Sequence, residues 1–434
     1  MNDLKLRRKK VLGSALSLSY SSPLTIVRGE GQYLYDADGR KYLDCVNNVC
    51  HVGHCHPAVV SAGQDQMALL NTNTRYLHPT IIELSEHLTS LLPDPLTVCF
   101  FVNSGSEANE LALRLARAHT QRREIVVLEH GYHGNTQGLI DVSHYKFAGK
   151  GGEGPGATTT VSLLPDPYRG KFQGHSTATA EAYAGEFKGL LEHLHSIGRP
   201  PAAFLAESIS GCGGQVLYPA GYLRMAADYL RSSGGLFIAD EVQVGFGRVG
   251  DDWWAFEADG FVPDIVTMGK PMGNGHPIAA VVTTQEVANS FNTGMEYFNT
   301  FGGNPVSAAI GKAVLSVLDS GGVKSNARDV GAYFLTQLQA LQSEHHIIGD
   351  VRGRGLFIGV DLVKCRESKE PATTLAGRVV EYAKEHGVLL STDGPGNNVL
   401  KIKPPLVINK EDVDTAIYVL GNALERVGRH EGVL

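Results

Sequence analysis

The sequence predicts an α/β fold in which a mainly parallel central sheet has helices on both faces and is joined to a smaller α+β domain. Through the middle of the 434-residue chain, short apolar and β-branched runs alternate with helical stretches, which is typical of a covered parallel sheet. The two ends lack this alternation, and near the N-terminus "QYLYDADGRKYL" is a hairpin pattern. The length suffices for one large domain and one smaller domain.

The central apolar runs end in polar residues or glycine loops. "TVCFFVNSGSEANELALRLARAH" predicts a strand, a Gly-Ser turn and a helix, and "EIVVLEHGYHG" predicts a strand that leads into a loop. Three further strands are expected in "PAAFLAES", "GGLFIADEVQ" and "DIVTMGK", and they end at Glu207, Asp240 and Lys270. Because ligands of such sheets bind at the carboxyl ends of the strands, these polar residues predict one shared site.

The chain ends are expected to combine into the smaller domain. Strand patterns in "VRGRGLFIGVDLV" and "VLKIKPPLVI" occur near the C-terminus, as the hairpin does near the N-terminus. We therefore predict that residues 1–65 and 315–434 form the small domain and that residues 66–314 form the large, cofactor-binding one. The start, "MNDLKLRRKKVLGSALSLSYSSP", predicts an amphipathic first helix rather than a signal peptide, because four serines interrupt its apolar part.

Composition and charge limit the classes of partner and the location that the sequence favours. The net charge of −7 offers no basic surface for nucleic acid, and no apolar run reaches transmembrane length, so neither a nucleic-acid nor a membrane partner is expected. Six scattered cysteines without a C-x-x-C pair favour a reducing, cytoplasmic location. Cysteines and histidines cluster in "CHVGHCH", but no second Cys/His pair lies at zinc-site spacing, so no metal is expected.

Taken in order, "NSGSEAN", "GYHG", "ADEVQVGFGR", "MGK" and "NTFGGNP" resemble the class III aminotransferases, which are pyridoxal 5'-phosphate (PLP) enzymes. The resemblance covers nearly the whole chain and implies the type I PLP-dependent transferase fold. It makes Lys270 the catalytic lysine that binds the cofactor aldehyde and Asp240 the partner of the pyridine nitrogen. The apolar run before Lys270 favours its neutral, nucleophilic amine.

The other cofactor contacts that the resemblance implies surround the ring and the phosphate. The phosphate is expected at a helix N-terminus, and one contact is expected from a neighbouring subunit, which implies a homodimer with sites at its interface. These residues are Gly105, Ser106 and Thr300 for the phosphate, Tyr132, His133 and Glu207 around the ring, and Gln243 for the phenolic oxygen. From the residues alone, "SGSEAN" could equally be an ordinary helix cap and Tyr132 a core residue.

Departures from the ordinary pattern point to the reaction. The family's R-x-x-P-P arginine, which binds a substrate carboxylate as a bidentate fork, is replaced by Lys401 in "LKIKPP". "ESISGCGGQ" brings Ser208, Ser210 and Cys212, and "DCVNNVCHVGHCHP" brings Asn47 and Asn48. With "MGKPMGNGHP" and "LLNTNTRYLHP", these stretches resemble the PLP phospho-lyases that act on O-phosphoethanolamine or 5-phosphohydroxylysine.

This branch implies a small phosphorylated amine as substrate and β-elimination of its phosphate. For phosphoethanolamine the products are acetaldehyde, ammonia and phosphate, with Lys270 as the general base. Tyr20, Asn47, Arg75 and Lys401 are candidates to hold the substrate phosphate, although a structural ion pair explains Arg75 equally well. Arg28 and Arg354 are expected to be structural.

Three alternatives stay open at this point. The chain could be an aminotransferase for amines or amino acids, or a phospho-lyase for 5-phosphohydroxylysine. A catalytically silent PLP-fold scaffold is the third, but it would tolerate loss of Lys270 and Asp240, which are both present. Phosphoethanolamine is preferred because no second carboxylate-binding arginine is evident.

Overall fold

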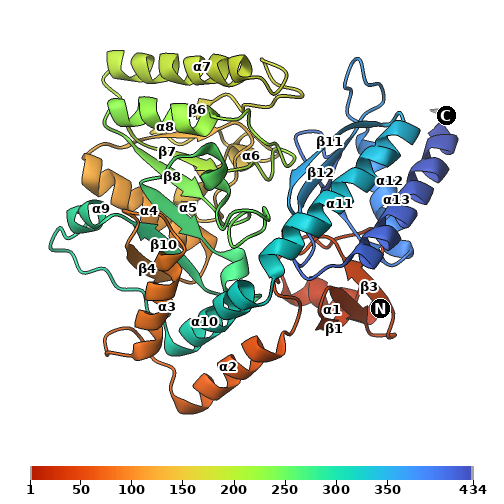
Figure 1. Cartoon of the computed structure of the whole chain (residues 1–434), viewed down its shortest axis with the longest axis horizontal. Coiled ribbons are helices and arrows are strands. Elements are labelled where there is room, and N and C mark those ends of the chain that lie inside the picture. The colour runs from red at the N-terminus through yellow and green to blue at the C-terminus, as the bar shows by residue number, and fades with distance from the viewer. Residues whose placement is uncertain (1, 432–434) are drawn as a thin grey trace.

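The large domain is built on a seven-stranded sheet (Figure 1). The computed structural model describes residues 2–431. In sheet order the strands are β4 (Val98–Val102), β10 (Ala279–Thr283), β9 (Ile265–Met268), β8 (Leu236–Asp240), β7 (Pro201–Glu207), β5 (Glu124–Leu128) and β6 (Thr159–Ser162). β10 is antiparallel to both of its neighbours, and the other strands share one direction. The predicted mainly parallel sheet is confirmed, with one inserted strand that the sequence did not reveal.

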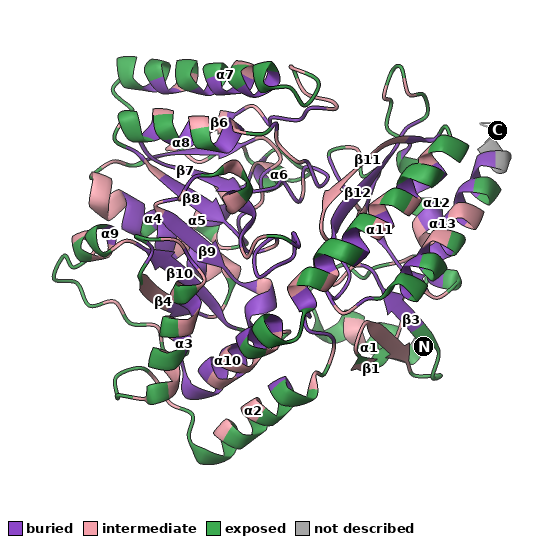
Figure 2. Cartoon of the chain, in the orientation of Figure 1, coloured by how far each residue is buried: buried purple, intermediate pink, exposed green. Residues whose placement is uncertain are grey.

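Helices cover both faces of this sheet because alternate strand residues point to opposite sides. In β7, Ala203 and Leu205 pack with helix α4 (Gly105–Thr120). Phe204 and Ala206 belong to the cluster on the other face, under α7 (Thr177–Ser196) and α8 (Tyr222–Ser232). Figure 2 shows the buried strands between helices whose outer surfaces are exposed.

The remaining elements of the large domain lie around this sandwich. They are α2 (Pro57–Leu69), α3 (Pro79–Ser90), α5 (Gln137–Ile140), α6 (His144–Phe147), α9 (Gln285–Ser290), α10 (Pro305–Ser320) and two 3-10 turns, Ala255–Asp259 and Lys270–Gly273. The predicted domain boundaries at residues 65 and 314 fall inside α2 and α10, which pack against each other. These boundaries stay a prediction.

The second domain contains two four-stranded sheets. One has the order β1 (Ile26–Glu30), β2 (Tyr33–Asp36), β3 (Lys41–Asp44), β13 (Val388–Leu389), and the other β11 (Ile348–Arg354), β12 (Phe357–Leu362), β15 (Val399–Ile402), β14 (Ser391–Asp393). Its helices are α1 (Asn2–Val11), α11 (Val323–Glu344), α12 (Thr373–Glu385) and α13 (Lys410–Glu431). The parallel pair β3 and β13 joins the two ends of the chain in one sheet.

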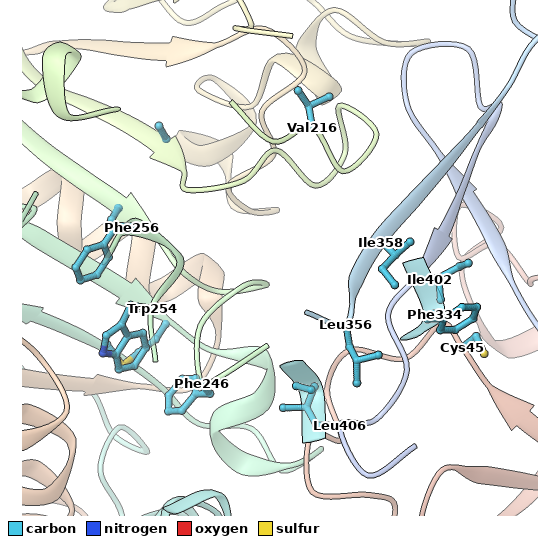
Figure 3. Close-up of a cluster of buried hydrophobic side chains, with 14 of the residues drawn as sticks. Cys45, Val216, Phe246, Trp254, Phe256, Phe334, Leu356, Ile358, Ile402 and Leu406 are labelled. Carbon is cyan, nitrogen blue, oxygen red and sulfur yellow. The ribbon is translucent and has the colours of Figure 1, made fainter. Parts of the chain in front are cut away.

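Buried apolar side chains from both parts of the chain form one cluster, which Figure 3 shows with Phe246 and Trp254 on one side and Leu356 and Ile402 on the other. The guanidinium of Arg248 is also fully buried there and donates hydrogen bonds to the carbonyl oxygens of Leu356 and Pro404. Burial lowers the pKa of Arg248 to about 9. This contact anchors the segment that follows β15, which matters for the site.

Two expectations about local structure need correction. Strand β9 ends at Met268, so Lys270 begins the next 3-10 turn instead of ending the strand. The first helix forms, but its charged residues surround it and Leu4 and Leu6 are exposed, so the predicted amphipathic character is absent. No single described helix is long and apolar enough to span a membrane; α10 and α11 reach that length and apolarity only together, across a 60° bend.

Candidate active site

Three loops meet at the carboxyl end of the large sheet. A Cβ atom added to Gly105, the first residue of α4, would lie 2.9 Å from Val242 Cγ1. A Cβ atom on Gly269 would lie 3.3 Å from the backbone nitrogen of Gly105 and 3.5 Å from Val242 Cγ1. The α4 N-terminus, the segment after Asp240 and the residue before Lys270 are therefore in contact, as the strand ends predicted.

The carboxylate of Asp240 is held by three donors. His133 Nδ1 lies 2.8 Å and Asn109 Nδ2 2.9 Å from Oδ2, and the backbone N–H of Val242 donates to Oδ1 at 3.1 Å. Asp240 is 4% exposed and the His133 ring is fully buried. The donors complement the negative charge and fix the carboxylate at the strand end, which is the arrangement needed to face a protonated ring nitrogen.

Asn109 connects this aspartate to two further elements. Its amide nitrogen also donates to the carbonyl oxygen of His133 at 2.7 Å, and its amide oxygen accepts from Thr267 Oγ1 on β9 at 2.7 Å. A single buried side chain on the first turns of α4 thus joins strands β8 and β9 to the "GYHG" loop. Because an amide buried without hydrogen-bond partners would destabilise the fold, these bonds hold Asn109, Asp240 and the "GYHG" loop in one arrangement.

Lys270 and Tyr132 lie at the rim of the site, where neither side chain is fully buried. Lys270 is half-buried, and among residues 2–431 its Nζ makes no hydrogen bond or ion pair. Tyr132 is half-buried, and its ring meets that of Tyr145 edge to face at 6.1 Å. Burial, together with Cys212 and Asp240, raises the pKa of Tyr132.

Glu207 and Gln243 are joined at the bottom of the site. Gln243 Nε2 lies 3.4 Å from Glu207 Oε1, and its amide oxygen accepts hydrogen bonds from Asn48 at 3.0 Å and from Lys403 Nζ at 3.1 Å. Burial raises the pKa of the Glu207 carboxyl to about 7, against the opposing effect of His133 and Lys403. Near neutral pH the raised pKa favours the protonated Glu207 carboxyl more than in an ordinary glutamate, beside Gln243 and Lys403.

Two lysines from the "LKIKPP" stretch share Asp393 of β14. Lys401 Nζ lies 3.2 Å from Oδ1, and Lys403 Nζ lies 3.6 Å from Oδ2, which also accepts from Gln215 at 2.9 Å. The Lys401 side chain is 25% exposed, whereas that of Lys403 is 2% exposed and lies over the ring of Phe357. Burial lowers the pKa of Lys403 to about 8. One aspartate cannot neutralise both ammonium groups.

In the single chain the predicted substrate contacts have protein partners: Tyr20 and Asn47 both lie near Asp44, and Lys401 pairs with Asp393. Tyr20 donates from its hydroxyl to the Leu390 carbonyl oxygen at 3.1 Å, and Asn47 spends its amide nitrogen on Asp44 at 3.0 Å. Arg75 is exposed, where it pairs with Glu296 at 3.0 Å and stacks on Phe298. Their role in binding the substrate phosphate stays a prediction.

Thr300 is exposed in the single chain. It follows the segment that pairs with Arg75, since Glu296 and Phe298 both contact that arginine. Arg75 and Thr300 thus lie on one exposed surface, and Asn299, next to Thr300, accepts a hydrogen bond at 3.0 Å from Asn103, just before α4. Their function stays a prediction that depends on a second subunit.

The other departures from the family pattern lie at buried or half-buried positions. Ser208 donates its hydroxyl to the buried carboxyl of Glu241. Cys212 is half-buried, and burial raises the pKa of its thiol to about 12. Arg28 pairs with Glu30 and Arg354 with Asp252, as expected of structural arginines. Within residues 2–431, no three Cys, His, Asp or Glu side chains gather as metal ligands.

Three residues of the site were missed or not assigned from the sequence. Asn109 stands inside the quoted "SGSEAN", four residues after Gly105, so its helical spacing placed it on the same face. Lys403 stands two residues after Lys401, and alternate residues of a strand share a face. Asn48 was noticed beside Asn47, but no local signal shows which of two adjacent amides reaches Gln243.

The residues present fit the phosphate and ring of PLP. The backbone N–H groups of Gly105 and Ser106 at the start of a 16-residue helix have no hydrogen-bond acceptor in the described chain, which suits a phosphate. Gly105 also leaves room that an alanine would fill. A fixed carboxylate at Asp240 and an unpaired amine at Lys270 complete the donor set. When bound, the cofactor supplies an electron sink for the carbon that bears the substrate amine.

Comparisons with known proteins agree with this chemistry. The aminotransferase class-III family model matches residues 17–424. A protein of Drosophila melanogaster named alanine–glyoxylate aminotransferase 2-like is 51% identical, covering 96% of this chain and 85% of that protein. The ethanolamine-phosphate phospho-lyase homolog 1 of Caenorhabditis elegans is 42% identical, covering 98% and 93%.

Solved structures that are similar to this chain include enzymes of the same kind. A phospholyase from Arthrobacter in complex with phosphoethanolamine superposes with a TM-score of 0.92 at 40% identity, covering 98% of this chain and 99% of that one. A PLP-bound amine transaminase from an uncultivated Pseudomonas species gives 0.87 at 29% identity, covering 96% and 98%. The chain therefore belongs to the class III aminotransferase family and is a PLP-dependent enzyme.

Proposed function

We propose that this enzyme eliminates phosphate from O-phosphoethanolamine and yields acetaldehyde, ammonia and inorganic phosphate. The observation that carries the proposal is the pair Lys401 and Lys403, whose ammonium groups both lie beside Asp393. Lys401 stands at the position of the family's carboxylate-binding arginine. Two point charges suit a phosphate dianion, whereas a planar carboxylate is better matched by the arginine fork. The phospho-lyase names of the C. elegans relative and the Arthrobacter structure support it.

In the proposed reaction, Lys270 acts as the general base. Its Nζ removes a proton from the carbon that bears the substrate amine, and Asp240 stabilises the ring that accepts the charge. The neighbouring carbon–oxygen bond then breaks with its electron pair on the phosphate oxygen, where Lys403 meets the developing charge. The product, an amino-alkene, takes up one water and gives the aldehyde and ammonia.

A phosphate-release assay tests the proposal. The holoenzyme is given phosphoethanolamine and 5-phosphohydroxylysine side by side, with Lys270→Ala as the inactive control and Arg28→Gln as a matched surface control. We expect release from phosphoethanolamine that depends on Lys270 and is unchanged in Arg28→Gln. Faster release from 5-phosphohydroxylysine would reassign the substrate, and unchanged release in Lys270→Ala would refute the role of that lysine.

Amino transfer is the second candidate function, and the name of the Drosophila relative favours it. The two reactions share Lys270 and Asp240 and differ in what binds the substrate's acidic group. An aminotransferase would leave the cofactor in its aminated form and release no phosphate. The Lys401 position is the reason to prefer elimination, because a lysine does not reproduce a bidentate carboxylate fork.

We also propose a homodimer with Thr300 and Arg75 reaching the partner's site. The end of α2, its connection to α3 and the segment around Thr300 expose large apolar side chains: Leu69, Leu70, Tyr76, Leu77, Met295 and Phe301. Leu77 is 100% exposed in the single chain, and such concentrations mark contact surfaces. Sedimentation should give twice the chain mass. A cytoplasmic location remains part of the proposal and rests on six unpaired cysteines.

A further inference from the structure

A basic cavity lies between the two domains. Its volume is about 490 Å³. His130, His144, Tyr145, Lys146 and Lys150 line one side, and the segment from Gly394 to Asn397, directly after β14, lines the other. α6, which carries His144 to Lys146, lies on the side of the large domain that faces the small one (Figure 1). No Asp or Glu is among the residues that line this cavity.

The cavity adjoins the active site. Lys146 Nζ lies 5.6 Å from the centroid of the Tyr132 ring and 5.3 Å from that of Tyr145. On the opposite wall, the backbone N–H of Gly394 donates to the Cys212 carbonyl oxygen at 3.1 Å. The two walls of the cavity are thus continuous with the loops that carry Tyr132 and Cys212. Asp240 acts electrostatically on Tyr132, and Glu207 acts on Cys212.

The two lysines of this cavity form no ion pair in the described chain, although Asp393 acts electrostatically on Tyr145 and Glu129 on both histidines. Neither Lys146 nor Lys150 has a carboxylate partner in the described chain, although the whole protein carries a net charge of −7. His144 Nδ1 accepts a hydrogen bond from the backbone N–H of His130 at 3.0 Å, so a neutral His144 carries its proton on Nε2 as a donor. Burial lowers the pKa of both histidines, so the two lysines supply the charge at neutral pH.

We propose that this cavity is an anion vestibule that binds a phosphate dianion on its way to and from the reaction centre. The vestibule is defined by Lys146, Lys150, His144 and Asn397. An acidic protein repels a dianionic substrate, and a local positive field beside the entrance offsets that repulsion and raises the association rate. The binding of free phosphate to the vestibule does not depend on the proposed function. The inference that the incoming phosphate belongs to phosphoethanolamine does rest on the proposed function.

The first test is a calorimetric titration of the PLP-saturated holoenzyme with inorganic phosphate. The double variant Lys146→Gln/Lys150→Gln is compared with Lys171→Gln/Lys188→Gln. The second variant removes the same amount of charge from two exposed lysines that pair with glutamates of α7. We expect about tenfold weaker phosphate binding in the first variant only. Equal affinity in both variants, or an equal loss in both, would overturn the proposal.

Because Lys403 can also bind phosphate, the titration is repeated in a Lys403→Gln background, where the vestibule's contribution should persist. The second test measures kcat/KM for phosphoethanolamine against ionic strength. The vestibule variant should show a roughly tenfold lower value at low salt and a weaker salt dependence, with kcat unchanged. A wild-type kcat/KM and salt dependence would refute the steering role. If the wild-type enzyme released no phosphate at all, the proposed function would fail, and the titration would still decide the vestibule.

Discussion

Replacing Lys403 by glutamine should separate function from stability. Lys403 places its ammonium 3.1 Å from the Gln243 amide oxygen and 3.6 Å from Asp393, with its side chain 2% exposed. Glutamine is one side-chain atom shorter than lysine, but it keeps a polar N–H donor near Gln243 and carries no charge. Lys401 and Gln215 remain to satisfy Asp393. The substitution therefore removes the buried positive charge while it keeps a polar side chain at this position.

The expected loss of activity follows from the phosphate interaction. A hydrogen bond to a charged group contributes about 1.5–3 kcal/mol, which corresponds to roughly ten- to hundredfold in kcat/KM for phosphoethanolamine. Lys401→Gln removes a charge that is 25% exposed, and its effect should be smaller because solvent screens it.

The fold should gain from the same substitution. Burial lowers the pKa of Lys403 from 10.5 to about 8, which corresponds to a destabilisation on the order of 3 kcal/mol at about 1.4 kcal/mol for each pKa unit. A lowered lysine pKa means that the unfolded chain holds more protons between pH 8 and 10.5, so wild-type stability rises with pH across that range. Below pH 8 the destabilisation is fully present, and glutamine avoids it.

The assays are initial rates of phosphate release at pH 7 and the midpoint of thermal unfolding for the wild type, Lys403→Gln and Lys401→Gln. We expect Lys403→Gln to lose activity while its Tm stays level or rises. Wild-type kcat/KM in Lys403→Gln would refute a role in binding phosphate. A fall in activity together with a fall of several degrees in Tm would mean that Lys403 is structural.

Three more substitutions test the site. Gly105→Ala should weaken PLP binding about tenfold, because its Cβ would lie 2.9 Å from a methyl carbon of Val242 beside the phosphate site. The control Gly185→Ala in α7 places its Cβ more than 4 Å from atoms outside its own helix and should leave PLP binding unchanged. Cofactor titration followed by absorbance compares the two variants. Asn109→Ala leaves Thr267 and the Asp240 carboxylate short of partners and should cost about 2–3 kcal/mol in urea unfolding; an unchanged midpoint would contradict the network. Burial raises the pKa of Glu207 to about 7, so the folded state holds the extra proton and wild-type stability should fall as pH rises from about 4.5 to 7; Glu207→Gln should flatten that slope, and a retained slope would assign it to another group.

Much of the site followed from local sequence pattern. Glu207 and Asp240 stand at the ends of continuous apolar runs, and the structure ends β7 and β8 at those residues. The start of α4 at Gly105 also followed from its Gly-Ser turn and amphipathic helix. Parallel strands then bring such ends to one edge of the sheet without further information.

What failed depended on contacts between distant segments. Lys401 in β15 and Lys403 directly after it both reach Asp393. The depth of Lys403 is set by the carbonyl of Cys45, which accepts from its backbone N–H, and by Arg248, which donates to the Pro404 carbonyl oxygen. Neither partner is near in sequence. The direction of β10 was equally hidden, because "AAVVT" is a short apolar run that fits either orientation.

The central claim is that Lys270 drives elimination of phosphate rather than transfer of the amine. It is tested most directly by following the cofactor spectrum while the holoenzyme turns over phosphoethanolamine without any added oxo acid. We expect many turnovers, equal amounts of phosphate and acetaldehyde, and a spectrum that returns to that of the resting enzyme. A single turnover that leaves the cofactor in its aminated form, with no phosphate released, would contradict it.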